Sequence, residues 1–111
     1  MDILVLGASY GSLFATKCLM AGHNVTLICT SRTAELINSE GTEVRIKLRG
    51  EDEHRSIRSK DYKGSCTAVT PDQSHPYSYD LIVLAMQEPQ YAIPDVKNLM
   101  KRIARSGRPV L

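Results

Sequence analysis

The sequence predicts an α/β fold with a doubly wound, mostly parallel sheet and an added exposed hairpin. Short apolar runs over residues 2–6, 24–29 and 80–86 are typical of strands that a parallel sheet buries on both faces. The first two runs flank a helical pattern, and together these segments fill about 30 residues, the usual length of a βαβ unit. The run 42–49 instead alternates apolar and charged residues, as a half-exposed strand does.

The glycines of the first βαβ unit predict its loop and the end of its helix. Residues 7–12 are expected to form a tight loop before a helix over about 11–21, where apolar residues recur at helical spacing. Gly22 is placed to terminate this helix. A shorter helix is expected over about 33–39, before Gly41.

The middle of the chain is expected to form the exposed hairpin. Residues 50–53 read Gly-Glu-Asp-Glu and predict a turn, after which 54–58 pairs back on 42–49. The pattern that follows is weaker, with a candidate strand at 66–69 and a loop at 70–76.

The last part of the chain predicts a strand, a helix and the start of a further strand. After the strand 80–86, Pro94 suits the first position of a helix, and Gly107 ends the helical pattern. Residues 108–111 have the character of the first residues of another buried strand. Because domain boundaries usually fall in exposed linkers, we expect residues 1–111 to be one domain that is truncated at its C-terminal end.

Composition and charge exclude several classes of function. A hydrophobic share of 42%, a charged share of 23% and a net charge of +2 give no general case for binding nucleic acid or a membrane. No apolar run approaches the ~20 residues that span a bilayer, and the N-terminus lacks the features of a signal peptide. The cysteines are far apart and are expected to be reduced thiols of a cytoplasmic protein. The histidines show no metal-ligand spacing, so no metal site is expected.

The segment between the first strand and the first helix indicates a phosphate site. Its relevant residues are Gly7, Ser9, Tyr10, Gly11 and Ser12. At such a joint the pyrophosphate of a dinucleotide lies on the helix N-terminus, where glycine allows close approach and free N–H groups hold the phosphate oxygens. We therefore expect Gly7, Gly11 and the N–H groups of residues 9–12 to bind pyrophosphate in a Rossmann-type domain. Two questions stay open in the sequence. Tyr10 either covers the cofactor or plugs the site. The glycines either bind phosphate or serve only a tight turn and close packing.

The same segment departs from the usual Gly-x-Gly-x-x-Gly fingerprint, because position 9 is Ser and the next glycine comes one residue early. It also spells Gly-x-Ser-x-Gly, the nucleophile elbow of α/β-hydrolases, in which Ser9 would be the nucleophile. An elbow belongs on a central strand, after strands that supply the oxyanion hole, and only one short strand precedes Gly7. The hydrolase is therefore the weaker interpretation.

The end of the second strand indicates the choice of cofactor. An Asp or Glu there would bind the ribose 2′-OH of NAD, whereas this sequence has Thr30, Ser31 and Arg32. Two hydroxyls and a guanidinium suit a 2′-phosphate, which Arg can hold with two hydrogen bonds. NADP is therefore favoured over NAD. The alternative is that Arg32 is simply a solvated residue that opens the next helix.

Two further motifs accompany the glycine segment, and the three together carry a family resemblance. Residues 21–27 read Ala-Gly-His-Asn-Val-Thr-Leu, and 80–85 read Asp-Leu-Ile-Val-Leu-Ala. With Gly-Ala-Ser-Tyr-Gly-Ser-Leu at 7–13, the chain resembles the N-terminal domain of the ketopantoate reductase family over its whole length. Typical members have Gly-Ala-Gly-x-x-Gly-Ser-Leu and Ala-Gly-His-x-Val-Thr-Leu at these places.

The resemblance implies the NADP-binding domain of an oxidoreductase that reduces a 2-keto acid such as ketopantoate, or acts as an opine-type dehydrogenase. The family's Arg for the 2′-phosphate falls at Thr30 on a gapless match, with Arg32 two residues on. Ala85, Met86 and Gln87 would line the path toward the nicotinamide, Gln87 standing where members usually have Lys. The family's main catalytic Lys lies in a C-terminal helical domain that residues 1–111 do not include, so no catalytic residue is expected here. The keto acid would be a ligand only with that domain supplied.

Fold does not fix function, and the alternative is a non-catalytic nucleotide-binding or oligomerisation module with the same fold. The altered glycine segment favours this alternative. An unfinished last strand and an absent second domain would leave apolar surface exposed, which a homodimer would cover.

Overall fold

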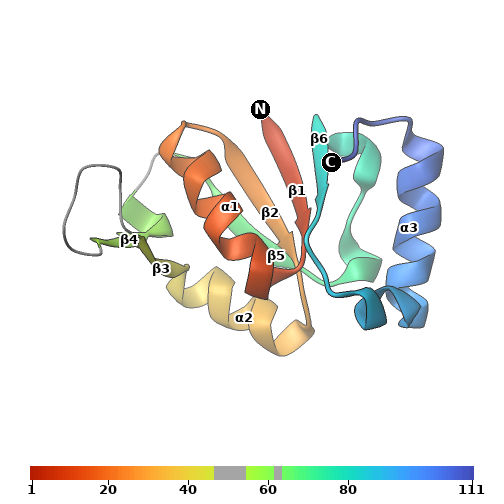
Figure 1. The fold of residues 1–111 in the computed structure, drawn as a ribbon, viewed down its shortest axis with the longest axis horizontal. Coiled ribbons are helices and arrows are strands. Elements are labelled where there is room, and N and C mark those ends of the chain that lie inside the picture. Colours follow the sequence, from red (N-terminus) through yellow and green to blue (C-terminus); the bar gives the residue numbers. More distant parts are fainter. Residues whose placement is uncertain (47–54, 62–63) are drawn as a thin grey trace.

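The described part of the chain forms a four-stranded parallel sheet, a two-stranded hairpin and three α-helices (Figure 1). The computed structural model describes residues 1–46, 55–61 and 64–111. The parallel sheet has the strand order β5-β2-β1-β6. Its strands are β1 (Asp2–Leu6), β2 (Asn24–Ile28), β5 (Cys66–Val69) and β6 (Leu81–Leu84). The predicted α/β class with a parallel sheet is therefore confirmed.

Helices cover both faces of this sheet, as a doubly wound fold requires. They are α1 (Ala8–Met20), α2 (Ser31–Glu40) and α3 (Pro94–Ser106). Alternating side chains of β1 divide the core: Ile3 and Val5 pack with α1 and α2, whereas Leu4 and Leu6 pack with α3. The central strand is thus buried on both faces, which explains its uninterrupted apolar sequence.

Helix α1 begins earlier than predicted, which removes the loop expected over residues 7–12. Gly7 alone redirects the chain after β1, because its φ of 109° and ψ of 113° are open to glycine. Its N–H donates to the carbonyl of Ile28 at 3.0 Å, which fixes the turn to β2. Helical backbone starts at Ala8, so the prediction of a loop as far as Ser12 is wrong.

The ends of other elements also differ slightly from the prediction. Helix α2 is longer than expected because Thr30 caps it, its Oγ1 accepting from the N–H of Thr33 at 3.4 Å. Gly41, with φ of 78°, ends α2. Helix α3 has Pro94 in its first turn and Gly107 at its C-cap, as predicted. Strands β2 and β6 are shorter than the apolar runs that predicted them.

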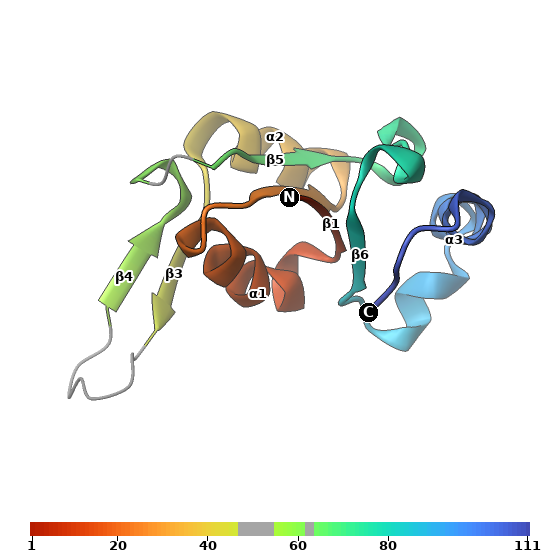
Figure 2. The same ribbon diagram turned by 90° about the horizontal axis from the view of Figure 1, so that it is seen from above.

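The predicted exposed hairpin is confirmed in its described part. Strands β3 (Glu43–Ile46) and β4 (Arg55–Arg58) pair antiparallel in a sheet of their own. Figure 2 shows this hairpin extending away from the parallel sheet, on the side opposite to α3. The predicted turn at 50–53 lies outside the described residues.

The segment with the weakest pattern contains β5 and several short 3₁₀ helices. The candidate strand at 66–69 is confirmed, and it runs parallel to β2. The 3₁₀ helices of the chain are η1 (Ser59–Asp61), η2 (Pro71–Gln73), η3 (Pro76–Ser78) and η4 (Glu88–Ala92). Two of them, η2 and η3, replace much of the predicted loop at 70–76.

Residues 109–111 run alongside β6 as the start of a strand. The N–H of Ile82 donates to the carbonyl of Pro109 at 2.9 Å, and the N–H of Leu111 donates back to Ile82 at 2.8 Å. Val110 and Leu111 are nevertheless 47% and 70% exposed. The backbone pairing agrees with the predicted strand. The side chains are more exposed than predicted, because β6 is the one strand beside this segment in the described part of the chain.

The outer edge of β5 is closed by a side chain of α2. The amide of Asn38 donates to the carbonyl of Ala68 and accepts from the N–H of Ala68, both at 2.8 Å. These are the groups that a further strand would use. One side chain therefore takes the place of a neighbouring strand at this position.

Replacing Asn38 by Ala is expected to lower the free energy of unfolding by about 2 kcal/mol, because two partly buried backbone groups lose their partners. Urea denaturation measures the change. Glu35→Ala, at an exposed position of the same helix, is the control and should change stability little. Equal stability of the two variants would show that the amide contributes nothing.

Candidate functional site

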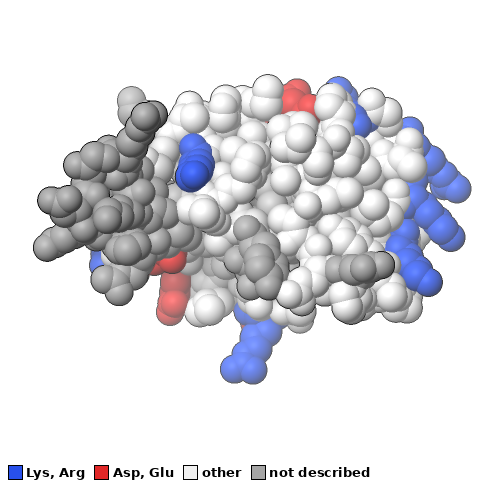
Figure 3. Space-filling model, in the orientation of Figure 1, with Lys and Arg blue, Asp and Glu red and all other residues white. Residues whose placement is uncertain are grey.

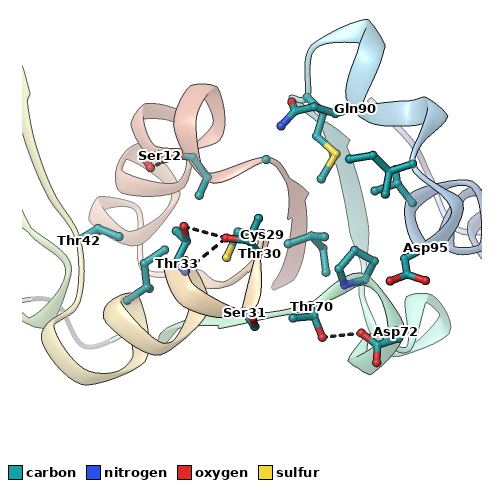
Figure 4. A pocket seen from close by; sticks show the side chains of 18 of the residues that line it. Ser12, Cys29, Thr30, Ser31, Thr33, Thr42, Thr70, Asp72, Gln90 and Asp95 are labelled. Carbon is teal, nitrogen blue, oxygen red and sulfur yellow. Dashed lines mark hydrogen bonds between the residues drawn. The ribbon is translucent and has the colours of Figure 1, made fainter.

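A cleft of about 690 Å³ lies at the edge of the sheet where the parallel strands end. Residues that directly follow β1, β2, β5 and β6 contribute to its wall (Figure 4). They are Gly7 after β1, Cys29 and Thr30 after β2, Thr70 after β5, and Met86 after β6. Ligands of open α/β sheets bind in this position, outside the carboxyl ends of the strands.

The cleft also receives the first turns of all three α-helices. Ala8 of α1, Ser31 of α2 and Asp95 of α3 line it. Because each helix follows a strand in a parallel arrangement, their N-termini converge at the same edge of the sheet. The partial positive charge of a helix N-terminus favours anions. The backbone therefore makes this edge attractive to phosphate.

The N-terminus of α1 offers backbone donors to the cleft. The N–H of Gly11 donates to the carbonyl of Gly7 at 3.1 Å, which begins the helical hydrogen-bond pattern. The N–H groups of residues 8–10 precede this bond and have no acceptor within the helix. The side chains of Ser9 and Tyr10 lie outside what the structure describes, so the two alternatives for Tyr10 stay open.

Gly11 has a packing role in the structure. It is buried, and a Cβ placed on it would come within 2.6 Å of the Val5 Cγ1 atom. Its N–H donates inside the helix, and the missing side chain allows close packing of α1 on β1, which is the packing alternative that the sequence leaves open. Ser12 lines the cleft, and its hydroxyl donates to the carbonyl of Ala8.

The structure places the predicted 2′-phosphate residues at the N-terminus of α2. Ser31 and the capping residue Thr30 line the cleft, whereas Arg32 is exposed in the first turn beside it. Thr30 also shares a hydrogen bond of 3.1 Å with the hydroxyl of Thr33. The Thr30 hydroxyl is thus already engaged in capping, and the N–H groups of Ser31 and Arg32 precede the first helical acceptor.

Of the residues predicted to line the path after β6, Met86 lines the cleft. Its N–H donates to the phenol oxygen of Tyr91 at 3.3 Å. The carbonyl of Ala85 lies where a side chain on Gly7 would project, at 2.7 Å from an added Cβ. Gln87 is exposed and takes part in a capping box with Gln90 at the start of η4.

Sequence reasoning missed the part of the cleft that follows β5. Thr70, Pro71 and Asp72 line it, and the Thr70 hydroxyl donates to the Asp72 carboxylate at 2.6 Å (Figure 4). This hydrogen bond is the main reason why the pKa of Asp72 is lowered, so the carboxylate is ionised at neutral pH. A Thr-Pro-Asp run directly after a strand could have indicated a helix start at the same edge.

Acidic side chains are unevenly placed in the cleft. Figure 4 shows Asp72 and Asp95 at one end, with Ser12 and Thr42 toward the other. At that second end the Glu43 carboxylate lies 4.0 Å from the Nε of Arg58, which partly compensates its charge. An anion would therefore be favoured near α1 and α2 and disfavoured near Asp72 and Asp95.

The backbone of Ser9 disfavours the hydrolase interpretation. Ser9 lies in the first turn of α1, and the described residues include no residue other than glycine with positive φ. A nucleophile elbow holds its serine in a strained turn between strand and helix. Gly7, two residues earlier, makes the turn in this chain.

The described residues lack both the side-chain grouping of a metal site and a helix that could span a membrane. Within them, no group of three or more His, Cys, Asp or Glu side chains is placed to hold a metal ion. None of the helices among them has the length and apolar character needed to cross a membrane. Cys18, Cys29 and Cys66 are free thiols whose pKa values are raised by burial.

The strand order, the helices on both faces and the cleft at the strand ends define a Rossmann-type α/β domain. The solved structure of the probable 2-dehydropantoate 2-reductase panE from Bacillus subtilis is similar, with a TM-score of 0.61 and 22% sequence identity. A putative ketopantoate reductase from Ralstonia solanacearum MolK2 is also similar, with a TM-score of 0.59 and 16% identity. The predicted resemblance to ketopantoate reductases is thus confirmed for the fold.

The chain corresponds to part of these enzymes. The alignments cover 99% and 97% of this chain but 32% and 30% of the respective reductases. No protein-family model matches the chain, and no curated protein matches it.

Proposed function

We propose that this chain binds NADP in the cleft and is the nucleotide-binding domain of a ketopantoate-reductase-like oxidoreductase. The observation that carries the proposal is the start of α1, where the N–H groups of residues 8–10 have no acceptor in the helix and Gly7, Ala8 and Ser12 line the cleft at the strand ends. A volume of about 690 Å³ lies within the usual range of cofactor sites. The likeness of the fold to two ketopantoate reductases supports the assignment.

The residues present fit a dinucleotide with two phosphate-bearing positions. The pyrophosphate would accept from the N–H groups at the start of α1, with Gly7 and Ser12 beside it. The 2′-phosphate would lie at the start of α2, near Ser31 and Arg32. Both positions lie away from the acidic end of the cleft. Their donors are mainly backbone groups, so an anion could bind although the described lining of the cleft includes no Lys or Arg.

The chemistry of the proposed enzyme would belong to the nicotinamide, which supplies a hydride when NADPH is bound. In this chain, Met86 would border the path toward the nicotinamide, and Ala85 and Gln87 flank it. Reduction of a 2-keto acid would further require groups from a second domain. The function proposed for residues 1–111 is therefore to bind and orient the cofactor.

Titration calorimetry with NADPH and NADH tests the proposal. Micromolar binding of NADPH is expected, with NADH about tenfold weaker, because a charged hydrogen bond to the 2′-phosphate contributes about 1.5 kcal/mol or more. Arg32→Ala should weaken NADPH binding by about the same factor and leave NADH unchanged. Lys17→Ala removes an equal charge at the opposite end of α1 and should change neither affinity.

Two outcomes would contradict the proposal at different points. If neither nucleotide binds, the function itself is wrong, and the non-catalytic interaction module becomes the leading hypothesis. If Arg32→Ala weakens NADPH and NADH equally, the cofactor site stands but the 2′-phosphate assignment is wrong.

A further inference from the structure

A second cavity, of about 320 Å³, lies between η3 and the C-terminal half of α3. Its lining residues are His75, Pro76, Tyr77, Arg102, Arg105 and Ser106. It shares no lining residue with the cleft. The second cavity is therefore a separate place from the proposed NADP site.

The lining of this second cavity is cationic. Arg102 and Arg105 are three residues apart on α3, so both side chains lie on one side of the helix. Arg108 adds a third guanidinium nearby, since its Nε donates to the carbonyl of Tyr77 at 3.2 Å. No carboxylate belongs to the described lining. Figure 3 shows Lys and Arg side chains gathered over this end of the molecule.

Arg102 is held in place by neutral partners. Its two terminal nitrogens donate to the carbonyls of Ser74, at 2.6 Å, and Pro71, at 2.7 Å. Its Nε is buried and has no hydrogen-bond partner among the described residues. Asp72 carries the charge that acts on Arg102, but it is fully exposed and bonded to Thr70. The guanidinium is thus fixed at the cavity with its charge incompletely balanced and one donor unused.

The other wall of the cavity suits an organic group. The Tyr77 ring is 63% exposed, and its centroid lies 6.0 Å from that of His75. Pro76, which is buried, completes this wall. A planar apolar group can pack against a tyrosine ring while an attached anion faces the arginines.

The geometry points to a second ligand site that takes a small organic phosphate monoester. The phosphate would face Arg102 and Arg105, because the described lining carries two guanidinium groups and no carboxylate, and guanidinium groups bind phosphate with paired hydrogen bonds. The organic part would lie against Tyr77 and Pro76. Ser106 and His75 border the site.

An NMR titration with phenyl phosphate tests this site. The largest amide shift changes are expected at His75, Tyr77, Arg105 and Ser106. Arg105→Ala should weaken binding by about tenfold, because it removes a charged hydrogen bond from an exposed residue that the fold does not need. Lys101→Ala, an exposed charge on the same helix outside the cavity, should weaken it less than twofold.

Two further ligands, benzoate and inorganic phosphate, test the charge and the organic part of the proposed ligand. Benzoate carries one negative charge and should bind more weakly than phenyl phosphate, so equal binding would contradict the dianion assignment. Shift changes at Gly7, Thr30 and Ser31 would place phenyl phosphate in the cleft and overturn the second site. If Arg105→Ala and Lys101→Ala weakened the binding of phenyl phosphate equally, the binding would come from general charge attraction and not from this site. Inorganic phosphate should bind more weakly than phenyl phosphate if the Tyr77 wall contributes.

Discussion

Replacing Gly7 by Ala is expected to lower the free energy of unfolding by about 4 kcal/mol, because the added methyl group brings both backbone strain and a clash. Gly7 has φ of 109°, which side-chain-bearing residues rarely adopt. The added Cβ would also lie 2.7 Å from the carbonyl oxygen of Ala85, a backbone atom that cannot rotate away. Urea denaturation of both proteins measures the difference.

Gly22→Ala is the matched control for Gly7→Ala. Gly22 also has positive φ, 92°, but nothing lies within 4 Å of its added Cβ. This variant carries the backbone strain without the clash and should cost about 1–2 kcal/mol. Equal losses in the two variants would show that the contact with Ala85 is unimportant. Any folded Gly7→Ala protein should also lose affinity for NADPH, because the start of α1 would shift.

Replacing Arg102 by Ala is expected to lower the free energy of unfolding by about 3 kcal/mol. The variant removes two charge-assisted hydrogen bonds to the carbonyls of Pro71 and Ser74. These bonds fasten α3 to the segment that carries Thr70 and Asp72 at the wall of the cleft. Amide hydrogen exchange should therefore become faster in residues 70–74. The midpoint of urea denaturation should also fall.

Arg105→Ala is the control that distinguishes the loss of the Arg102 hydrogen bonds from the loss of a positive charge on α3. Arg105 lies one turn further along α3 and is exposed, so its removal should change stability by less than about 0.5 kcal/mol. If both variants were equally stable, the bonds made by Arg102 would not hold the segment. If exchange in 70–74 stayed slow in Arg102→Ala, other contacts would fix that wall.

The apolar strands could be predicted from the sequence because burial on both faces leaves continuous apolar runs. The start of α1 could not be predicted, because a single glycine with positive φ makes a turn that usually needs several loop residues. The sequence does not give the φ angle. Strand β5 is only a candidate in the sequence because Cys66–Val69 has four residues, too few to show a clear period. Its place in the sheet depends on pairing with β2 and on the amide of Asn38, a contact between residues 30 apart.

Part of the candidate site could be predicted, because part of it follows strands that the sequence shows clearly. The starts of α1 and α2 follow directly from strands that the sequence shows, so Gly7, Ser12, Thr30 and Ser31 were found and line the cleft. The contributions of Asp72 and Asp95 depend on where β5 and α3 lie in space, which local pattern does not determine. The sequence leaves two roles open for Gly11, because a packing glycine and a phosphate glycine look alike in a sequence, and the structure shows the packing contact.

The amide of Asn38 has a consequence for self-association. Edge-to-edge growth into a fibre needs two free edges on every molecule, one to accept a strand and one to offer the next. Asn38 occupies the outward N–H and C=O groups of Ala68, so a strand of a second molecule cannot pair with β5 at this position. Asn38 therefore makes the edge of β5 a poor template for strand addition by another molecule.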